Sequence, residues 1–236
     1  PEARRIMIDS KITESLAAAA TDFPSRTAVI DPTRSLSYAE LHRLSNQCAK
    51  GLATLGLRKG DRVALLVQPG ADLMVLAYGM FKLGLVPVLI DPGIGRGRLA
   101  DCLREAAPRA FVGTPLADWA RWMLGWAKHT LEVAVVVGRP GVPGSIPFHR
   151  LLSSAPDRLP SPGEIGEDDL AAIAFTSGST GAPKGVVFTQ GMFEAQAELL
   201  RDSFEIRPGE IHLATFPLFA LYDAALRMTT VFPRMD

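Results

Sequence analysis

The sequence predicts an α/β fold in which mostly parallel sheets are covered by helices on both faces. Short apolar runs of strand length, such as residues 62–67 and 86–90, alternate with longer stretches of helical pattern. These runs are apolar at almost every position, as expected when both faces of a parallel sheet are buried. A chain of 236 residues is also long enough to bury a sizeable core.

The first elements are predicted by the residues at their ends. An alanine-rich segment at residues 10–20 predicts a helix, and a short strand is expected over residues 27–31. Ser37 stands three residues before Glu40, which is the spacing of a capping box. A long helix is therefore expected over residues 38–55.

Strands and helices alternate from residue 62 onward. The loop segment 153–166, rich in proline, glycine and serine, predicts a boundary between a first α/β subdomain, residues 1–160, and the start of a second, residues 161–236. The strands are expected over residues 62–67, 86–90, 110–112, 133–137, 170–175 and 211–216, and the helices over residues 71–83, 98–106, 115–128 and 191–203.

All three tryptophans of the chain, Trp119, Trp122 and Trp126, recur at helical spacing within residues 115–128. The simpler interpretation is a helix packed on the sheet through these side chains. The alternative is a surface that docks a partner or a lipid-like substrate.

Composition excludes several classes of protein. Acidic and basic residues balance at 25 each, which gives no indication of a nucleic-acid partner. Cys48 and Cys102 lie far apart without a Cys/His cluster, so neither a disulfide framework nor a zinc site is expected. Cys48 falls on the apolar face of its helix and is assigned to the core. No apolar run approaches the ~20 residues that span a bilayer, and we expect a cytoplasmic protein without a transmembrane segment.

The most informative motif is a run of glycine and hydroxyl residues that ends in a lysine and lies between two apolar strands. Its glycines let successive backbone N–H groups converge on one anionic oxygen cluster, and the lysine adds a positive charge. This combination suits the phosphates of a nucleotide. The residues expected to contact phosphate are Thr176, Ser177, Gly178, Ser179, Thr180, Gly181 and Lys184.

Other interpretations of the glycine-rich segments are weaker. The run ending in Lys184 lacks the spacing and the Gly-Lys-Ser/Thr ending of a Walker A loop. A flexible linker is the plain alternative, but a linker would not lead directly from one apolar strand into another. Residues 93–98 resemble a dinucleotide fingerprint, but the third glycine stands at the wrong interval.

Residues 176–185 resemble the phosphate-binding motif of the adenylate-forming superfamily, which includes acyl-CoA synthetases, luciferases and nonribosomal peptide adenylation domains. Residues 36–41 and 81–92 are similar to the first two core motifs of that superfamily. The resemblance implies ATP and Mg²⁺ as cofactors. It also implies Lys184 and Thr180 as catalytic residues, with Thr180 at the magnesium ion.

Residues 216–223 resemble the aromatic motif that borders the acyl or aryl pocket in the same superfamily. The implied substrate-binding residues are Phe219, Ala220, Tyr222 and Asp223. Many thioester-forming relatives carry a histidine where this chain has Ala220, so the coenzyme A half-reaction is not implied. Residues 91–96 and 218–223 together resemble the β-lactone synthetases of bacterial long-chain olefin biosynthesis. This narrower resemblance implies a fatty β-hydroxy acid as substrate and assembly with other enzymes of that pathway.

Three functions remain open from the sequence. The first is ATP-dependent formation of an acyl-adenylate that closes to a β-lactone, and the second is formation of an acyl-CoA thioester. The third, for this stretch alone, is a nucleotide-binding module without turnover. The superfamily's adenine and ribose motifs and its adenylation lysine would follow Asp236, so we expect a fragment of a longer protein. The sequence does not indicate an oligomeric state.

Overall fold

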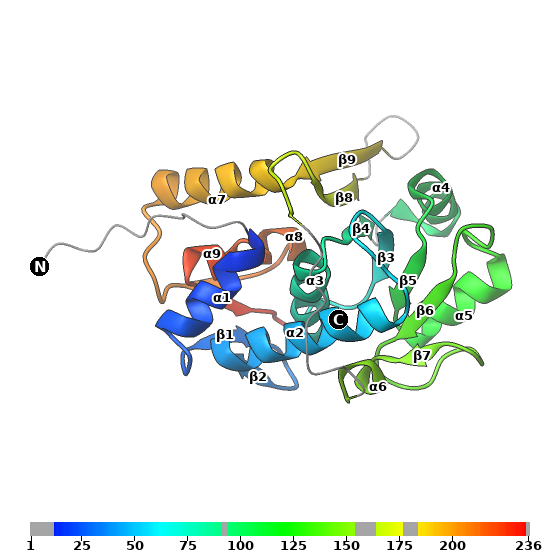
Figure 1. Cartoon of the computed structure of the whole chain (residues 1–236), viewed down its shortest axis with the longest axis horizontal. Helices are drawn as coiled ribbons and strands as arrows, with labels where there is room; N and C mark the ends of the chain where they lie inside the picture. Colours follow the sequence, from blue (N-terminus) through cyan, green and yellow to red (C-terminus); the bar gives the residue numbers. More distant parts are fainter. Residues whose placement is uncertain (1–11, 91–93, 154–163, 177–183, 235–236) are drawn as a thin grey trace, which may run out of the picture.

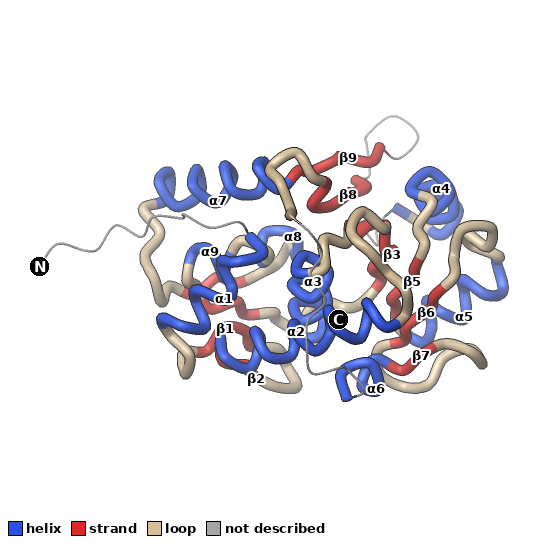
Figure 2. Tube along the Cα trace, viewed as in Figure 1, coloured by secondary structure: helices blue, strands red, loops and turns tan. Residues whose placement is uncertain are grey.

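The computed structural model describes residues 12–90, 94–153, 164–176 and 184–234 and arranges them in two sheets surrounded by helices (Figures 1 and 2). The strands are β1 (Thr27–Ile30), β2 (Ser35–Ser37), β3 (Arg62–Leu66), β4 (Val86–Ile90), β5 (Ala110–Gly113), β6 (Val133–Val136), β7 (Ile146–Pro147), β8 (Leu170–Thr176), β9 (Lys184–Thr189), β10 (Ile211–Leu213) and β11 (Thr229–Val231). The helices are α1 (Ile12–Asp22), α2 (Tyr38–Thr54), α3 (Ala71–Lys82), α4 (Arg96–Ala106), α5 (Pro115–Leu124), α6 (Phe148–Ser153), α7 (Gln190–Phe204), α8 (Pro217–Ala220) and α9 (Asp223–Leu226). Within these residues, no helix has both the length and the apolar character needed to cross a membrane.

The larger sheet has seven strands in the order β7-β6-β5-β3-β4-β8-β9, and every neighbouring pair is parallel except β8 and β9. The smaller sheet has the order β10-β11-β1-β2, in which only β1 and β2 run antiparallel. The predicted α/β class is therefore confirmed. Both sheets take strands from either side of residue 160, and the division into two subdomains stays a prediction.

Helices cover both faces of the larger sheet because its strands bury alternate side chains in opposite directions. Val63 and Leu65 join the large core that includes α2 and α3. Ala64, between them, packs with Leu103 of α4 and with Trp126, which follows α5. This alternation accounts for the nearly continuous apolar sequence of the central strands.

The ends of α2 and α5 follow from individual residues. Ser37 Oγ accepts a hydrogen bond from the backbone N of Glu40, whose carboxylate accepts one from the Ser37 backbone N, so the predicted capping box is confirmed. Cys48 is fully buried, as expected. The predicted helix over residues 115–128 ends earlier, at Leu124, because Gly125 takes a left-handed conformation with φ of 63°.

The tryptophans divide between the two interpretations that the sequence left open. Trp126 is buried at 6% exposure, but Trp119 and Trp122 are 42% and 60% exposed. Trp126 therefore packs in the core as the packed-helix interpretation requires, although from the turn after α5, and the interpretation is wrong for the other two.

The predicted strand over residues 211–216 is shorter than expected and ends at Leu213. Pro217 begins the helical turn α8, and Phe216 acts as its cap.

Candidate functional site

The phosphate motif begins and ends on a β-hairpin. Strands β8 and β9 pair antiparallel, and Thr176 stands directly opposite Lys184. The segment 177–183 joins these two positions. The expected phosphate contacts at Ser177, Gly178, Ser179, Thr180 and Gly181 therefore lie outside the described residues. Lys184 itself is exposed at the start of β9, so its ammonium group is available at the base of this segment.

The hairpin opens at the carboxyl edge of the larger sheet. β4 and β8 are parallel neighbours with Ile90 beside Phe175, so both strands end at that edge. From β4 the chain crosses β3 to reach β5, whereas from β8 it turns the other way into β9. Open α/β sheets bind ligands where neighbouring strands part in this manner. Residues 91 and 92, the end of the second superfamily motif, lie outside the described residues.

Gly185 of β9 lies against side chains of β8. It pairs with Phe175, and a Cβ atom at Gly185 would stand 3.0 Å from the Phe175 ring and 3.3 Å from Cγ2 of Ile173. A side chain at this position would need the Phe175 ring or β9 to shift by a few tenths of an ångström. The glycine that follows Lys184 in the motif therefore positions the lysine through strand packing.

A chain of aromatic rings connects β9 with the predicted substrate motif. Phe188 of β9 lies 5.6 Å from Phe193 of α7, and Phe193 stacks on Tyr222 at 5.1 Å. Tyr222 lies 6.5 Å from Phe219, which lies 5.7 Å from Phe216. The rings fix β9, α7 and α8 relative to one another, so the strand that begins at Lys184 and the substrate motif form one packed unit.

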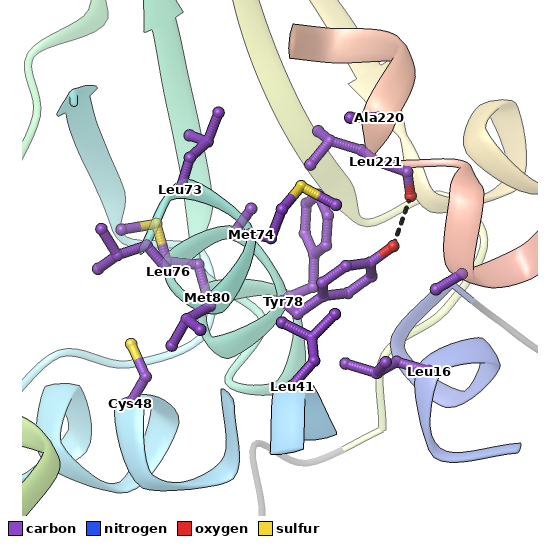
Figure 3. Packing of buried hydrophobic residues seen from close by; sticks show 14 of the residues in the cluster. Leu16, Leu41, Cys48, Leu73, Met74, Leu76, Tyr78, Met80, Ala220 and Leu221 are labelled. Carbon is purple, nitrogen blue, oxygen red and sulfur yellow. Dashed lines mark hydrogen bonds between the residues drawn. The ribbon is translucent and has the colours of Figure 1, made fainter. Parts of the chain in front are cut away.

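The predicted substrate residues differ widely in exposure. Phe219 is 43% exposed, whereas Ala220 and Tyr222 are buried. Ala220 packs in the core beside α3, where Tyr78 donates a hydrogen bond of 3.0 Å to the carbonyl oxygen of Leu221 (Figure 3). The Tyr222 hydroxyl donates to Oε1 of Gln196 at 2.6 Å. Phe219 is therefore the predicted substrate residue whose side chain is presented at the surface.

Asp223, the fourth predicted substrate residue, is bound from within the protein. Nδ1 of His212 lies 2.9 Å from Oδ2 of Asp223, and Oγ1 of Thr230 donates to the same oxygen at 2.6 Å. Burial raises the pKa of Asp223, against the effect of these two hydrogen bonds, and the bond to Asp223 raises the pKa of His212. The carboxylate thus joins α9 to β10 and β11.

Several residues of this region had no role in the sequence-based prediction. His212 was given no function, and Phe193, Gln196 and Thr230 belong to no recognised motif. One local signal was available for α7, because Thr189 caps it by accepting a hydrogen bond of 3.3 Å from the Met192 backbone N. That cap places Phe193 on the first turn of the helix, on the side that faces Tyr222.

The comparisons with known proteins agree with this geometry. Residues 16–232 match the family described as AMP-binding enzyme. An olefin β-lactone synthetase of Xanthomonas campestris pv. campestris is 45% identical over 202 residues, which are 86% of this chain and 36% of the relative. A long-chain-fatty-acid–CoA ligase, FadD13, of Mycobacterium tuberculosis is 32% identical over 92% of this chain and 42% of the relative.

A solved structure supports the fold. The anthranilate CoA ligase AuaEII in complex with anthranoyl-AMP matches the whole chain with a TM-score of 0.86 at 21% identity, over 47% of its own length. The chain spans well under half the length of the curated relatives named above. Because the family match extends over residues 16–232, the chain belongs to the AMP-binding enzyme family of adenylate-forming enzymes.

Proposed function

We propose that the protein carrying this chain activates a fatty β-hydroxy acid with ATP and closes the product to a β-lactone. In the first step, a carboxylate oxygen attacks the α-phosphorus of ATP, the bond to pyrophosphate breaks, and an acyl-adenylate forms. In the second step, the β-hydroxyl oxygen of the substrate attacks the activated carbonyl carbon. The hydroxyl proton passes to water, the bond to the phosphate breaks, and AMP leaves.

The observation that carries the adenylation step is the register of β8 and β9. It puts Lys184 opposite Thr176 at the carboxyl edge of the sheet, at the base of the segment that resembles the phosphate-binding motif. An exposed ammonium group there can contact the β- and γ-phosphates and stabilise the charge that develops as pyrophosphate leaves. The assignment of Lys184, Thr176 and residues 177–181 to phosphate is part of the proposal.

The proposal includes a magnesium ion that is bound together with the nucleotide. Among the described residues, no group of three His, Cys, Asp or Glu side chains could hold a metal ion. Mg²⁺ usually keeps several waters and is bound through substrate phosphates together with one or two side-chain oxygens. The ion would arrive with the nucleotide and neutralise phosphate charge, and Thr180 is the proposed side-chain contact.

Lactone closure is supported by the relatives and by Ala220. The 45% identity is to a protein named olefin β-lactone synthetase. Ala220 is fully buried where many thioester-forming relatives carry a histidine. The 32% identity to a long-chain-fatty-acid–CoA ligase favours the second candidate, an acyl-CoA thioester.

We place the reaction in the cytoplasm. ATP is supplied there, and the free, buried thiols of Cys48 and Cys102 fit a reducing compartment. Assembly with other enzymes of olefin biosynthesis is part of the same proposal, because it follows from the β-lactone product.

The deciding experiment incubates the protein in its natural length with ATP and a β-hydroxy fatty acid, with and without coenzyme A. A β-lactone, AMP and pyrophosphate formed without coenzyme A are the expected products. A thioester formed only with coenzyme A would establish the second candidate. Neither product, together with no pyrophosphate exchange into ATP, would leave a nucleotide-binding module without turnover.

A further inference from the structure

Helix α5 turns its apolar side chains toward solvent. Leu116, Trp119, Trp122 and Met123 recur along one side of the helix and are 77%, 42%, 60% and 73% exposed. The two indole rings meet edge to face at 5.8 Å, so they form a continuous apolar surface. A surface helix of a globular protein normally buries such a stripe against the core.

The polar side of α5 faces the protein. Asp118 is fully buried, and its carboxylate pairs with Arg121 at 2.6 Å. Oδ2 of Asp118 also accepts hydrogen bonds from the Val142 backbone N at 2.8 Å and from Ser145 Oγ at 2.7 Å. Turning the helix to bury its tryptophans would leave this charge buried without partners, which is strongly unfavourable. The network therefore fixes the apolar stripe on the outside.

A hollow with basic side chains adjoins the stripe. It has a volume of about 310 Å³ and lies between α4 and the turn that follows α5. Its apolar lining includes Leu103, Leu124 and Trp126, and Arg104, Lys128 and His129 add nitrogen donors. Arg104 shares its charge with Asp101 of the same helix at 2.8 Å, but the described lining itself contains no carboxylate. The hollow is therefore complementary to an anion.

We propose that the exposed stripe of α5 and the adjoining hollow form a docking surface for an anionic lipid bilayer. Tryptophan is enriched at membrane interfaces, and a helix that combines exposed apolar residues with nearby cations lies in the headgroup region. Since the whole chain carries no net charge, attraction to anionic lipid depends on this local group of cations. A bilayer is favoured over a protein groove because Leu124, the last residue of α5, is 59% exposed and also lines the hollow. Apolar surface on α5 thus reaches the place where Arg104 and Lys128 can meet a lipid phosphate.

Docking at a bilayer would bring the enzyme to its fatty substrate. Only this connection to a fatty substrate rests on the proposed function. The docking surface itself depends on α5 and the hollow. Figure 1 shows α5 at the opposite end of the molecule from α7, the helix that packs beside β9. The bilayer would therefore meet a face that is remote from α7.

The test measures co-sedimentation of the natural-length protein with vesicles of phosphatidylcholine alone and of phosphatidylcholine mixed with phosphatidylglycerol, without ATP or fatty acid. Binding to the mixed vesicles is expected, and it should weaken as salt is added. The double variant Trp119→Ser, Trp122→Ser should lower the partition coefficient at least ~10-fold. Lys128→Glu should lower the partition coefficient on the vesicles that contain phosphatidylglycerol and leave it unchanged on those of phosphatidylcholine alone.

The matched control is Leu199→Ser with Phe204→Ser on α7, where both side chains are similarly exposed, at 65% and 72%. This control should bind vesicles as the wild type does. Circular dichroism and pyrophosphate exchange without vesicles should be unchanged in the tryptophan variant, which separates loss of docking from loss of fold or of adenylation. Absent vesicle binding by the wild type, or equal binding by the tryptophan variant, would overturn the proposal. If the wild type is a dimer that does not bind vesicles, and the tryptophan variant is a monomer, the face would instead be assigned to a second copy of the chain.

Discussion

His212 of β10 and Asp223 of α9 form a hydrogen-bonded pair, with Nδ1 of the imidazole 2.9 Å from Oδ2 of the carboxylate. Because an ionised carboxylate can only accept, the imidazole must carry a proton on Nδ1. Asp223 is 3% exposed, and Thr230 Oγ1 donates to the same oxygen. The pair fixes the segment that follows Phe219 to the smaller sheet.

Asp223→Asn should destabilise the protein by about 1–3 kcal/mol, because a charge-assisted bond to His212 is lost inside the protein. The hydrogen bond raises the pKa of His212 above its ordinary value of 6.5. The stabilisation that protonated His212 gains from Asp223 is therefore fully present below about pH 6.5. It is lost as the pH rises through the pKa of His212 in the folded protein. Urea unfolding measured across this pH range should show that the difference in unfolding free energy between wild type and Asp223→Asn becomes smaller as the pH rises. Asp202→Asn, at a surface ion pair with Arg201, should change stability by at most ~1 kcal/mol.

In the reaction proposed above, Lys184 makes one charge-assisted contact to the departing pyrophosphate. Lys184→Ala should therefore lower turnover about 10²–10³-fold. Lys184 is exposed, so the thermal unfolding midpoint should be preserved. Steady-state release of pyrophosphate by the natural-length protein measures the effect. The control is Arg43→Ala, a cation on α2 whose guanidinium contacts Gln47. Turnover equal to that of wild type would remove Lys184 from the mechanism.

Tyr222 should tolerate loss of its hydroxyl far better than loss of its ring. Tyr222→Phe removes the bond to Gln196 and should cost about 0.5–1.5 kcal/mol. Tyr222→Ala also removes the stacking on Phe193 and opens a cavity, so about 3–5 kcal/mol is expected. Chemical denaturation gives both values. Phe204→Ala, at a side chain that is 72% exposed, should stay within ~0.5 kcal/mol of wild type, and a similar loss there would argue against the ring chain.

Lys82 should make the stability of the protein rise with pH. Its ammonium group is buried between α2 and α3 and donates to Ser45 Oγ and Asn46 Oδ1, each at 2.7 Å. Burial lowers the pKa of Lys82 from 10.5 to about 7. Between these two values the unfolded chain binds more protons than the folded one, so the folded state gains stability as the pH increases.

Lys82→Met removes that titration. The unfolding free energy of wild type relative to this variant should therefore increase from about pH 7 toward pH 10. Ser45→Ala keeps the buried lysine and should retain the wild-type pH dependence. A constant difference between wild type and Lys82→Met across this range would show that Lys82 does not titrate there.

Elements with local signals were predicted well. Ser37 and Glu40 lie within one turn of each other, so the start of α2 could be read from sequence alone. The strand at 170–175 and the lysine that begins β9 were equally local, and the superfamily motif identified their connection. These two strands were enough to predict that Lys184 lies where the connection between them ends and the second strand begins.

Features that depend on distant residues could not be predicted. Asp118 is buried because Val142 and Ser145, which lie more than twenty residues further along the chain, supply its hydrogen bonds. Helical spacing alone gave no reason to turn the tryptophans outward. Phe193 and Thr230 reach the candidate site through the packing of α7 and β11, to which no motif corresponds. The short strands β2 and β11 are too brief and too polar for a periodicity to reveal them.

The parallel pairing of β1 with β11 has a consequence for how the protein is made. Val29 lies beside Thr230, and Thr229 Oγ1 donates to the carbonyl oxygen of Thr27 at 2.7 Å. During translation, β1 leaves the ribosome long before its partner exists, at an elongation rate of about 5–20 residues per second. For roughly ten seconds or more, the backbone N–H and C=O groups on the edge of β1 that later pairs with β11 are unpaired. They can form hydrogen bonds with a strand of another chain. The β1–β2 hairpin therefore keeps one edge of β1 open to mispairing until residue 231 has emerged.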